Sequence, residues 1–274
     1  MSLMLKLLAI AVLASSLFGD VKNADIEDFL YKTFKNNKDI KSINIKVIVK
    51  TKLEQMPSWN AFIVDVNAVL NNNRKVNQKM IWFSNGIVIT KELVNLKTGA
   101  SLADDVSPKF KAEFYKKENL IYGNKNAKHK VAIFSDPLCP FCGTFVPEAI
   151  KYMKKRPDTF AIYYYHFPLP SLHPAAVELT KAAIAAELAG HKNATLDMYK
   201  VKVDSKERDV SKILKVFNKS MGTKITPNDL KNPEVVSHYE SDQKIADYLM
   251  VQGTPTMFFD GKEDKRKNKF KENK

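Results

Sequence analysis

The two cysteines of this chain, Cys139 and Cys142, are the feature that most restricts its fold and chemistry. They lie in the segment FSDPLCPFC, residues 134–142. Before them, Val131–Ser135 is a short apolar run typical of a buried strand, and after them Gly143–Lys155 has the pattern of a helix. A spacing of three residues at the start of a helix brings both sulfurs to its first turn. With only two cysteines, a disulfide-dense scaffold and a four-cysteine zinc site are excluded.

The two cysteines are not equivalent in this arrangement. Cys139 lies at the helix N-terminus, where unpaired backbone N–H groups and the helix dipole stabilise a thiolate. Cys142 lies one turn further in and lacks those donors, so we expect it to be the resolving thiol. Pro140 tolerates the first helical position because it has no N–H to lose there.

Three interpretations of the cysteine pair compete. A structural disulfide that closes so short a loop would stabilise the fold little. A metal site needs further ligands, and the nearby histidines show no ligand spacing with the cysteines. A redox-active dithiol after a strand is therefore favoured, and no metal is expected. The histidines considered as ligands are His129, His166 and His173.

Composition restricts the class of protein further. Hydrophobic residues make up 45% and charged residues 27% of the 274 residues, as in folded globular proteins and unlike disordered chains. The net charge is +14, but the basic residues are dispersed along the chain. We therefore expect no nucleic acid among the partners, although an aromatic run at residues 163–165 accompanies the basic charge.

The N-terminus predicts export. Residues 1–19 read MSLMLKLLAIAVLASSLFG, with Lys6 as the only charge, an apolar run over Leu7–Leu13 and small residues after it. This order is typical of a secretory signal peptide, and the run is too short for a membrane-spanning helix. An uncleaved N-terminal anchor is the alternative. We expect the mature chain to work in the periplasm, an oxidising compartment.

Residues 20–100 predict a small α+β domain. A helix over Ala24–Phe34 precedes an alternating strand over Ser42–Leu53, in which Ile48 interrupts the polar face. This unit contains neither histidine nor cysteine, so we expect it to serve assembly, as the contact of a homodimer. Two further strands are expected at Trp59–Leu70 and Val76–Phe83, and a hairpin through Asn85-Gly86.

Residues 101–119 predict an amphipathic linker helix. Val106, Phe110 and Phe114 recur every four residues among lysines, and Pro108 lies early, where a helix tolerates proline best. We expect this helix to connect two domains. The alternative is a helix packed on the core of either domain.

Residues 120–274 alternate between strand and helix patterns. This alternation predicts an α/β fold, a sheet covered by helices. A helical insertion is expected at about residues 170–232. Strands are expected at Val131–Ser135, Phe160–Phe167 and Thr256–Phe259, and helices at Gly143–Lys155, Pro174–Ala189, Ala194–Val203, Asp209–Met221 and Pro233–Met250.

The motifs resemble those of a known family. FSDPLCPFC is similar to the active-site segment of the exported thiol:disulfide interchange proteins of bacteria, the Dsb family, which have a thioredoxin fold. Gly253-Thr254-Pro255-Thr256 resembles the cis-proline loop of that fold, and Pro147 resembles its helix-kinking proline. The order of signal, small domain, linker and catalytic domain resembles the dimeric DsbC and DsbG. The long helical insertion resembles that of DsbA.

The resemblance implies roles for individual residues. Cys139 and Cys142 would be catalytic, with Pro140 and Phe141 as active-site support. Thr254 and Pro255 would bind an extended substrate chain by strand addition. Phe141 departs from the tyrosine or histidine common there. Ile133 occupies the position of a buried acid in related proteins, which leaves Cys142 without that proton relay.

The resemblance implies a thiol:disulfide oxidoreductase or isomerase that acts on exported client proteins. Its redox-active disulfide, Cys139–Cys142, would need no other cofactor, and a membrane oxidant or reductant would recycle it. The direction of the reaction stays open. The alternative function is a holdase chaperone with secondary redox activity. His166 could face the active site or be structural, and His173 and His191 are expected to be capping or surface residues.

Overall fold

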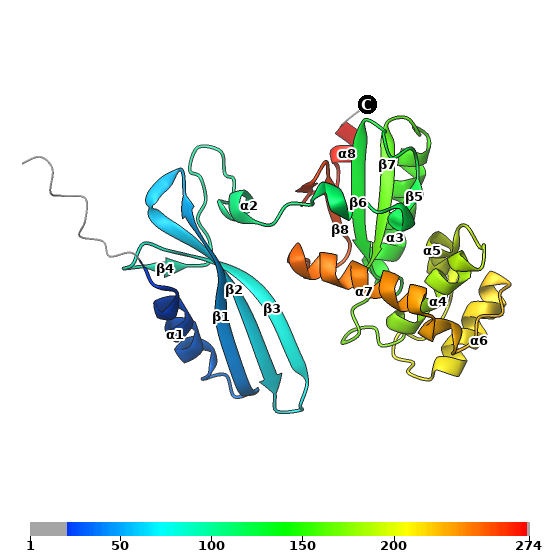
Figure 1. Ribbon diagram of the computed structural model, residues 1–274, viewed down its shortest axis with the longest axis horizontal. Helices are drawn as coiled ribbons and strands as arrows, with labels where there is room; N and C mark the ends of the chain where they lie inside the picture. The colour runs from blue at the N-terminus through cyan, green and yellow to red at the C-terminus, as the bar shows by residue number, and fades with distance from the viewer. Residues whose placement is uncertain (1–20, 273–274) are drawn as a thin grey trace, which may run out of the picture. The chain divides into compact units, whose positions relative to one another are not determined.

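The structure, a computed structural model, describes residues 21–272, so the signal peptide predicted at residues 1–19 lies outside the described residues. The chain divides into two compact units between Ser107 and Pro108 (Figure 1). In the part that the structure describes, no helix has the length and apolar character needed to cross a membrane.

The N-terminal unit is an α+β unit with one four-stranded antiparallel sheet. Its strands pair in the order β1-β2-β3-β4 (Figure 1). The short strand β4 pairs only with the end of β3, through a connection at residues 85–88 that is longer than a two-residue turn. The elements are α1 (Asn23–Phe34), β1 (Ile40–Leu53), β2 (Met56–Leu70), β3 (Lys75–Ser84) and β4 (Ile89–Thr90).

One face of this sheet packs against α1. Ile26 and Leu30 of α1 are buried, because they lie one helical turn apart on the same side of the helix. Ile45 and Val47 of β1 face them, two residues apart as alternation requires. The alternation predicted for β1 then fails at Val49, which is 43% exposed. A register shift between Val47 and Val49 inserts one extra residue and reverses the faces that follow.

The linker helix predicted over residues 101–119 is not formed. The segment contains α2 (Ala103–Val106), a 3-10 turn η1 (Ala112–Phe114) and a second one η2 (Lys117–Asn119). The helix ends because Ser107 precedes a proline and is therefore extended, with φ −61° and ψ 139°. Phe110 instead packs into the C-terminal unit, where it contacts Tyr115, Tyr165 and Phe258.

The C-terminal unit is an α/β unit built on a five-stranded mixed sheet in the order β5-β7-β6-β8-β9. β6 and β7 are parallel, and β8 is antiparallel to β6. The strands are β5 (Leu120–Tyr122), β6 (His129–Ser135), β7 (Phe160–His166), β8 (Thr256–Phe259) and β9 (Lys262–Glu263). The helices are α3 (Pro140–Lys154), α4 (Ala176–Leu188), α5 (Ala194–Asp197), the 3-10 turns η3 (Met198–Lys200) and η4 (Asp229–Lys231), α6 (Val210–Met221), α7 (Pro233–Tyr248) and α8 (Lys269–Glu272).

Helices cover both faces of this sheet, so β7 is buried along its whole length and β6 from Val131 to Ser135. On one face, Ile133 and Tyr164 lie in a core formed with α3 and the helices of the insertion. On the other face, Phe134 and Tyr165 lie in a core formed with α7 and Phe110. Alternation along β6 and β7 therefore decides which side chains face the cysteines. The helical insertion follows β7 and contains α4, α5 and α6 (Figure 1).

Candidate active site

Cys139 is the N-cap residue of α3, and Pro140 occupies the first helical turn. The carbonyl of Cys139 accepts the hydrogen bond of the Gly143 N–H at 2.9 Å, which begins the helix. Cys139 is 8% exposed and Cys142 is fully buried. The structure thus places the two sulfurs at the beginning of a 15-residue helix, with only the first of them reaching the surface.

Phe141, between the cysteines, is 75% exposed. An apolar ring that stands in water beside a partly exposed sulfur is a surface that an apolar segment of another chain can cover. Cys139 therefore lies beside an exposed apolar side chain, with Cys142 buried behind it.

The Thr254–Pro255 peptide bond is cis and lies beside the cysteines. The Cys139 thiol donates a weak hydrogen bond to the Thr254 carbonyl, with 3.7 Å between sulfur and oxygen. The Thr254 hydroxyl is buried and forms no hydrogen bond of normal geometry. Segments separated by more than 110 residues thus meet at one place. All six residues identified in the sequence, Cys139, Pro140, Phe141, Cys142, Thr254 and Pro255, belong to these two segments.

Burial dominates the chemistry of Cys142. It raises the pKa of the Cys142 thiol to about 11, and the adjacent Cys139 adds to the rise. Polar groups around the sulfur oppose it, namely the hydroxyls of Ser135 and Thr254 and the backbone N–H of Asp136. Cys142 therefore holds its proton at neutral pH when both cysteines are reduced.

A buried carboxylate supports the loop before the cysteines. Asp136 is fully buried, and its oxygens accept hydrogen bonds from the backbone N–H groups of Leu138 at 2.7 Å and Leu169 at 2.8 Å. The ring of His173 lies 2.9 Å from the same carboxylate. His173 is thus a half-buried partner of Asp136 and not a surface or capping residue. The sequence interpretation did not select Asp136, although the Asp-Pro pair signals a turn there.

A chain of hydroxyl groups lies on the same side of the sheet. The Ser135 hydroxyl is 2.6 Å from the Tyr199 hydroxyl, which is 2.8 Å from the Tyr164 hydroxyl. These residues come from the end of β6, from η3 in the helical insertion and from β7. Sequence reasoning did not select them, because no local pattern relates three polar side chains on separate elements.

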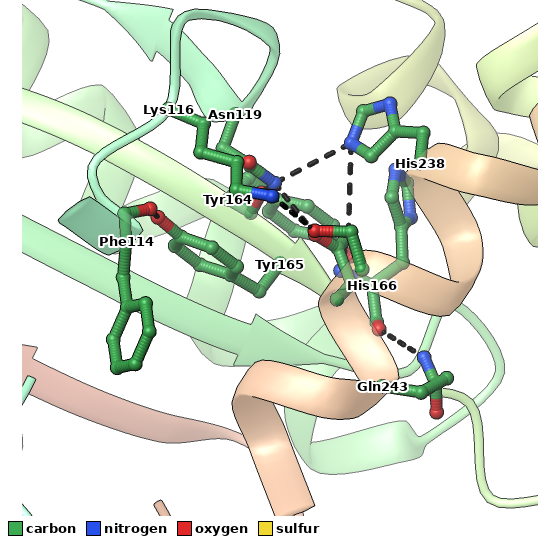
Figure 2. A network of polar contacts seen from close by, with 10 residues as sticks. Phe114, Lys116, Asn119, Tyr164, Tyr165, His166, His238 and Gln243 are labelled. Atoms are coloured by element: carbon green, nitrogen blue, oxygen red, sulfur yellow. Dashed lines mark hydrogen bonds and ion pairs between the residues drawn. The ribbon is translucent and has the colours of Figure 1, made fainter. Parts of the chain in front are cut away.

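His166 belongs to a different buried network (Figure 2). Its backbone N–H donates to the Asp242 carboxylate at 2.8 Å, and the Asn119 side-chain amide donates to the same carboxylate at 2.8 Å. His238 lies 3.7 Å from Asp242. Burial raises the pKa of Asp242 to about 8 and lowers those of both histidines. His166 is therefore structural and not a component of the cysteine site.

The same network contains the one cluster of metal-ligand type found among residues 21–272. His166, His238 and Asp242 each place one ligand atom within 4.8 Å of the others. The amide of Asn119 already occupies this space, since it donates to Asp242 and lies 3.4 Å from the His238 ring nitrogen (Figure 2). The cluster is explained as a hydrogen-bonded junction between β7 and α7. His129, considered as a ligand near the cysteines, instead pairs with Asp260 at 2.8 Å.

Known structures resemble part of the chain. A thioredoxin-like oxidoreductase from Silicibacter pomeroyi DSS-3 is 21% identical, with a TM-score of 0.42, and the match covers 54% of this chain and 87% of that one. DsbA2 from Pseudomonas aeruginosa is 20% identical, with a TM-score of 0.40 and coverage of 54% and 84%. Oxidised BdbD from Bacillus subtilis is 19% identical, with a TM-score of 0.46 and coverage of 61% and 92%.

Among curated proteins, none matches this sequence. The family model described as thioredoxin matches residues 115–274. That range contains the mixed sheet, the cysteine pair and the Thr254–Pro255 bond, and it spans more than half of the chain. The protein therefore belongs to the thioredoxin family.

Proposed function

We propose that this protein is a thiol:disulfide oxidoreductase that exchanges disulfides with exported client proteins. The observation that carries the proposal is the meeting of Cys139 and Cys142, at the beginning of α3, with the Thr254–Pro255 segment. Membership of the thioredoxin family agrees with it. The Cys139–Cys142 disulfide is the only redox group that the reaction requires.

The difference in burial assigns the two thiols to different steps. In the reducing direction, the partly exposed Cys139 attacks a client disulfide as a thiolate and forms a mixed disulfide. The buried Cys142 then attacks the Cys139 sulfur, so that the bond to the client breaks and the Cys139–Cys142 disulfide forms. The client leaves with both of its sulfurs reduced. In the oxidising direction, a client thiolate attacks the Cys139–Cys142 disulfide and the same steps run in reverse.

Single substitutions of the cysteines test this assignment. Cys139→Ser is expected to abolish exchange, because it removes the accessible nucleophile. Cys142→Ser is expected to accumulate mixed disulfides, because nothing resolves them. Both are measured with a fluorescent disulfide-containing peptide and by non-reducing gel electrophoresis. Full exchange activity in both single variants would contradict the dithiol mechanism.

We also propose that the N-terminal unit forms a homodimer. Two observations support this. The first is that β1 is a long strand at one edge of its sheet, and such edges favour pairing between chains. Eight of the twelve exposed large apolar side chains among the described residues lie in this unit. They are Phe29, Tyr31, Ile48, Val49, Ile87, Val88, Val94 and Leu96.

Sedimentation of the full chain tests the dimer. Wild-type protein is expected to sediment as a dimer at micromolar concentration. Val49→Lys on β1 is expected to shift it toward monomer, because the change places a charge beside the exposed strand edge. Leu188→Lys is the matched control, since Leu188 is 51% exposed in the C-terminal unit. A monomeric wild type would contradict the proposal.

The exposed apolar side chains of the N-terminal unit also favour the holdase function as a second candidate. A variant with both cysteines replaced by serine separates the two functions. Retained protection of an aggregating client by this variant would favour the holdase. Loss of protection together with loss of exchange would favour the oxidoreductase.

A further inference from the structure

The resolving thiol presents a problem that the cysteines and the Thr254–Pro255 segment do not solve. Cys142 must become a thiolate to attack the mixed disulfide, yet it is fully buried. Ile133, which lies in the same core, offers no group that exchanges protons or donates a hydrogen bond from its side chain. The thiolate therefore needs stabilisation from groups other than Ile133.

Ser135 lies on the side of the sheet that faces this sulfur. Alternation along β6 places Ser135 on the same side as Ile133, which shares a core with Cys142. From there the Ser135 hydroxyl lowers the pKa of the Cys142 thiol. A hydroxyl carries a single proton, so Ser135 can donate to the sulfur only when it does not donate to another acceptor. A second donor to the Ser135 oxygen would fix its proton toward Cys142.

Tyr199 is placed to be that second donor, since either hydroxyl of the Ser135–Tyr199 pair can donate. Its hydroxyl lies 2.6 Å from the Ser135 hydroxyl, and the Tyr164 hydroxyl lies 2.8 Å on the other side of it. A phenol gives up its proton more readily than an alkyl hydroxyl, so a thiolate at Cys142 favours one direction along the chain. Tyr164 donates to Tyr199, Tyr199 donates to Ser135, and Ser135 donates to the sulfur. Each bond in such a series strengthens its neighbours.

We propose that Tyr199, supplied by the helical insertion, is a positioning residue for the resolving step and orients the Ser135 hydroxyl toward the Cys142 thiolate. The proposal rests on the proposed function and deepens it. In the step itself, Cys142 loses its proton to solvent, and its thiolate attacks the Cys139 sulfur. A disulfide forms between Cys139 and Cys142, and the client sulfur leaves as a thiolate that takes up a proton.

The test measures the thiolate population of Cys142 directly, without a client. In a Cys139→Ser background Cys142 is the only thiol, and its alkylation rate with iodoacetamide between pH 7 and 9 follows the thiolate fraction. Tyr199→Phe is expected to lower this rate about threefold to tenfold, as expected for the loss of one hydrogen bond in a series to a charged group. Ser135→Ala is expected to lower it about tenfold or more, and Tyr164→Phe by less than Tyr199→Phe.

Two controls separate orientation from a general loss of structure. Tyr122→Phe removes a tyrosine hydroxyl that donates to the Lys154 carbonyl at 3.0 Å, outside the chain of hydroxyls, and should leave the rate unchanged. A larger reagent, N-ethylmaleimide, should show the same ratios as iodoacetamide, because a change of access would slow the larger reagent more. In the Ser135→Ala background, Tyr199→Phe should have no further effect, since it acts through Ser135.

The proposal is overturned if Tyr199→Phe leaves the Cys142 rate equal to that of the Tyr122→Phe control, or if its effect persists in the Ser135→Ala background. Failure of the proposed function has a different signature. It would appear as a wild-type protein that does not exchange disulfides while Ser135→Ala and Tyr199→Phe still slow the alkylation of Cys142. That result would retain the role of Tyr199 in stabilising the thiolate.

Discussion

Replacing Asp242 by asparagine should change how the stability of the C-terminal unit depends on pH. Asp242 is fully buried, and burial raises its pKa from 3.8 to about 8, against hydrogen bonds from the His166 backbone N–H and the Asn119 amide that lower it. In the unfolded chain the same carboxyl has a pKa near the ordinary value of about 4. Below pH 4 both states hold the proton. Between pH 4 and 8 only the folded state holds it, so stability falls as pH rises through that window.

The size of the effect follows from this window. Each pH unit within it costs the folded state about 1.4 kcal/mol, so raising the pH from 5 to 8 costs on the order of 4 kcal/mol. Asparagine has no proton to release. It retains one acceptor oxygen for the two donors that Asp242 satisfies, and the lost hydrogen bond costs about 1–3 kcal/mol at every pH. The stability of Asp242→Asn relative to wild type should therefore increase from pH 5 to pH 8.

Urea unfolding at several pH values measures this difference. Nine of the ten tyrosines lie in the C-terminal unit, and both tryptophans lie in the N-terminal unit. Tyrosine circular dichroism thus follows the unit that is changed, and tryptophan fluorescence follows the other unit as an internal reference. The buried histidines titrate in both proteins, so subtracting wild type from variant isolates Asp242.

Glu240→Gln is the matched control, because Glu240 is an exposed carboxylate on the same helix. Its stability relative to wild type should be nearly constant with pH. A difference between Asp242→Asn and wild type that does not change between pH 5 and 8 would refute the reasoning, since it would mean that the carboxyl has the same proton affinity in both states.

Three further predictions concern other parts of the C-terminal unit. Phe141→His should make the cysteine pair more oxidising by a few tens of millivolts at most, because a histidine adds a donor or a positive charge that favours the Cys139 thiolate; an unchanged potential after equilibration with glutathione would contradict this. Burial lowers the pKa of His166 well below 6.5. The folded state therefore loses stability as the pH falls below about 6.5, where the unfolded chain binds the proton and the folded chain does not. His166→Gln should weaken this loss of stability between pH 7 and 5, as measured by urea titration. Phe110→Ala should destabilise the unit by about 3–5 kcal/mol, as for other buried aromatic residues, because Phe110 is 5% exposed among aromatic rings; a change in tyrosine-detected stability below 1 kcal/mol would show that Phe110 does not belong to this core.

The elements of secondary structure were largely predictable from the sequence. Alternation over residues 42–53 and helical spacing over residues 174–189 and 209–221 correspond to β1, α4 and α6. These patterns lie within short windows of the chain, and they depend on backbone geometry that neighbouring residues decide together. The prediction failed where one residue overrides a pattern, as Pro108 does in the predicted linker helix.

The candidate site was predictable to the same extent. A strand followed by two cysteines and a helix is a local pattern, and Thr254-Pro255 before a strand is another. Each pattern identified the residues of one segment. Only the resemblance to a known family related the two segments to each other. The structure brings Cys139 to 3.7 Å from the Thr254 carbonyl.

Only the tertiary structure decided what surrounds the buried sulfur. Ser135, Tyr164 and Tyr199 come from two strands and an inserted 3-10 turn, and their hydroxyls meet only when the insertion packs against the sheet. Asp136 and Asp242 are ordinary acidic residues in the sequence, and burial with specific donors gives each its role. Periodicity tells which face of an element is buried, but the partner of a buried polar group depends on long-range packing, because hydrogen bonds are satisfied between atoms that are near in space and not in sequence.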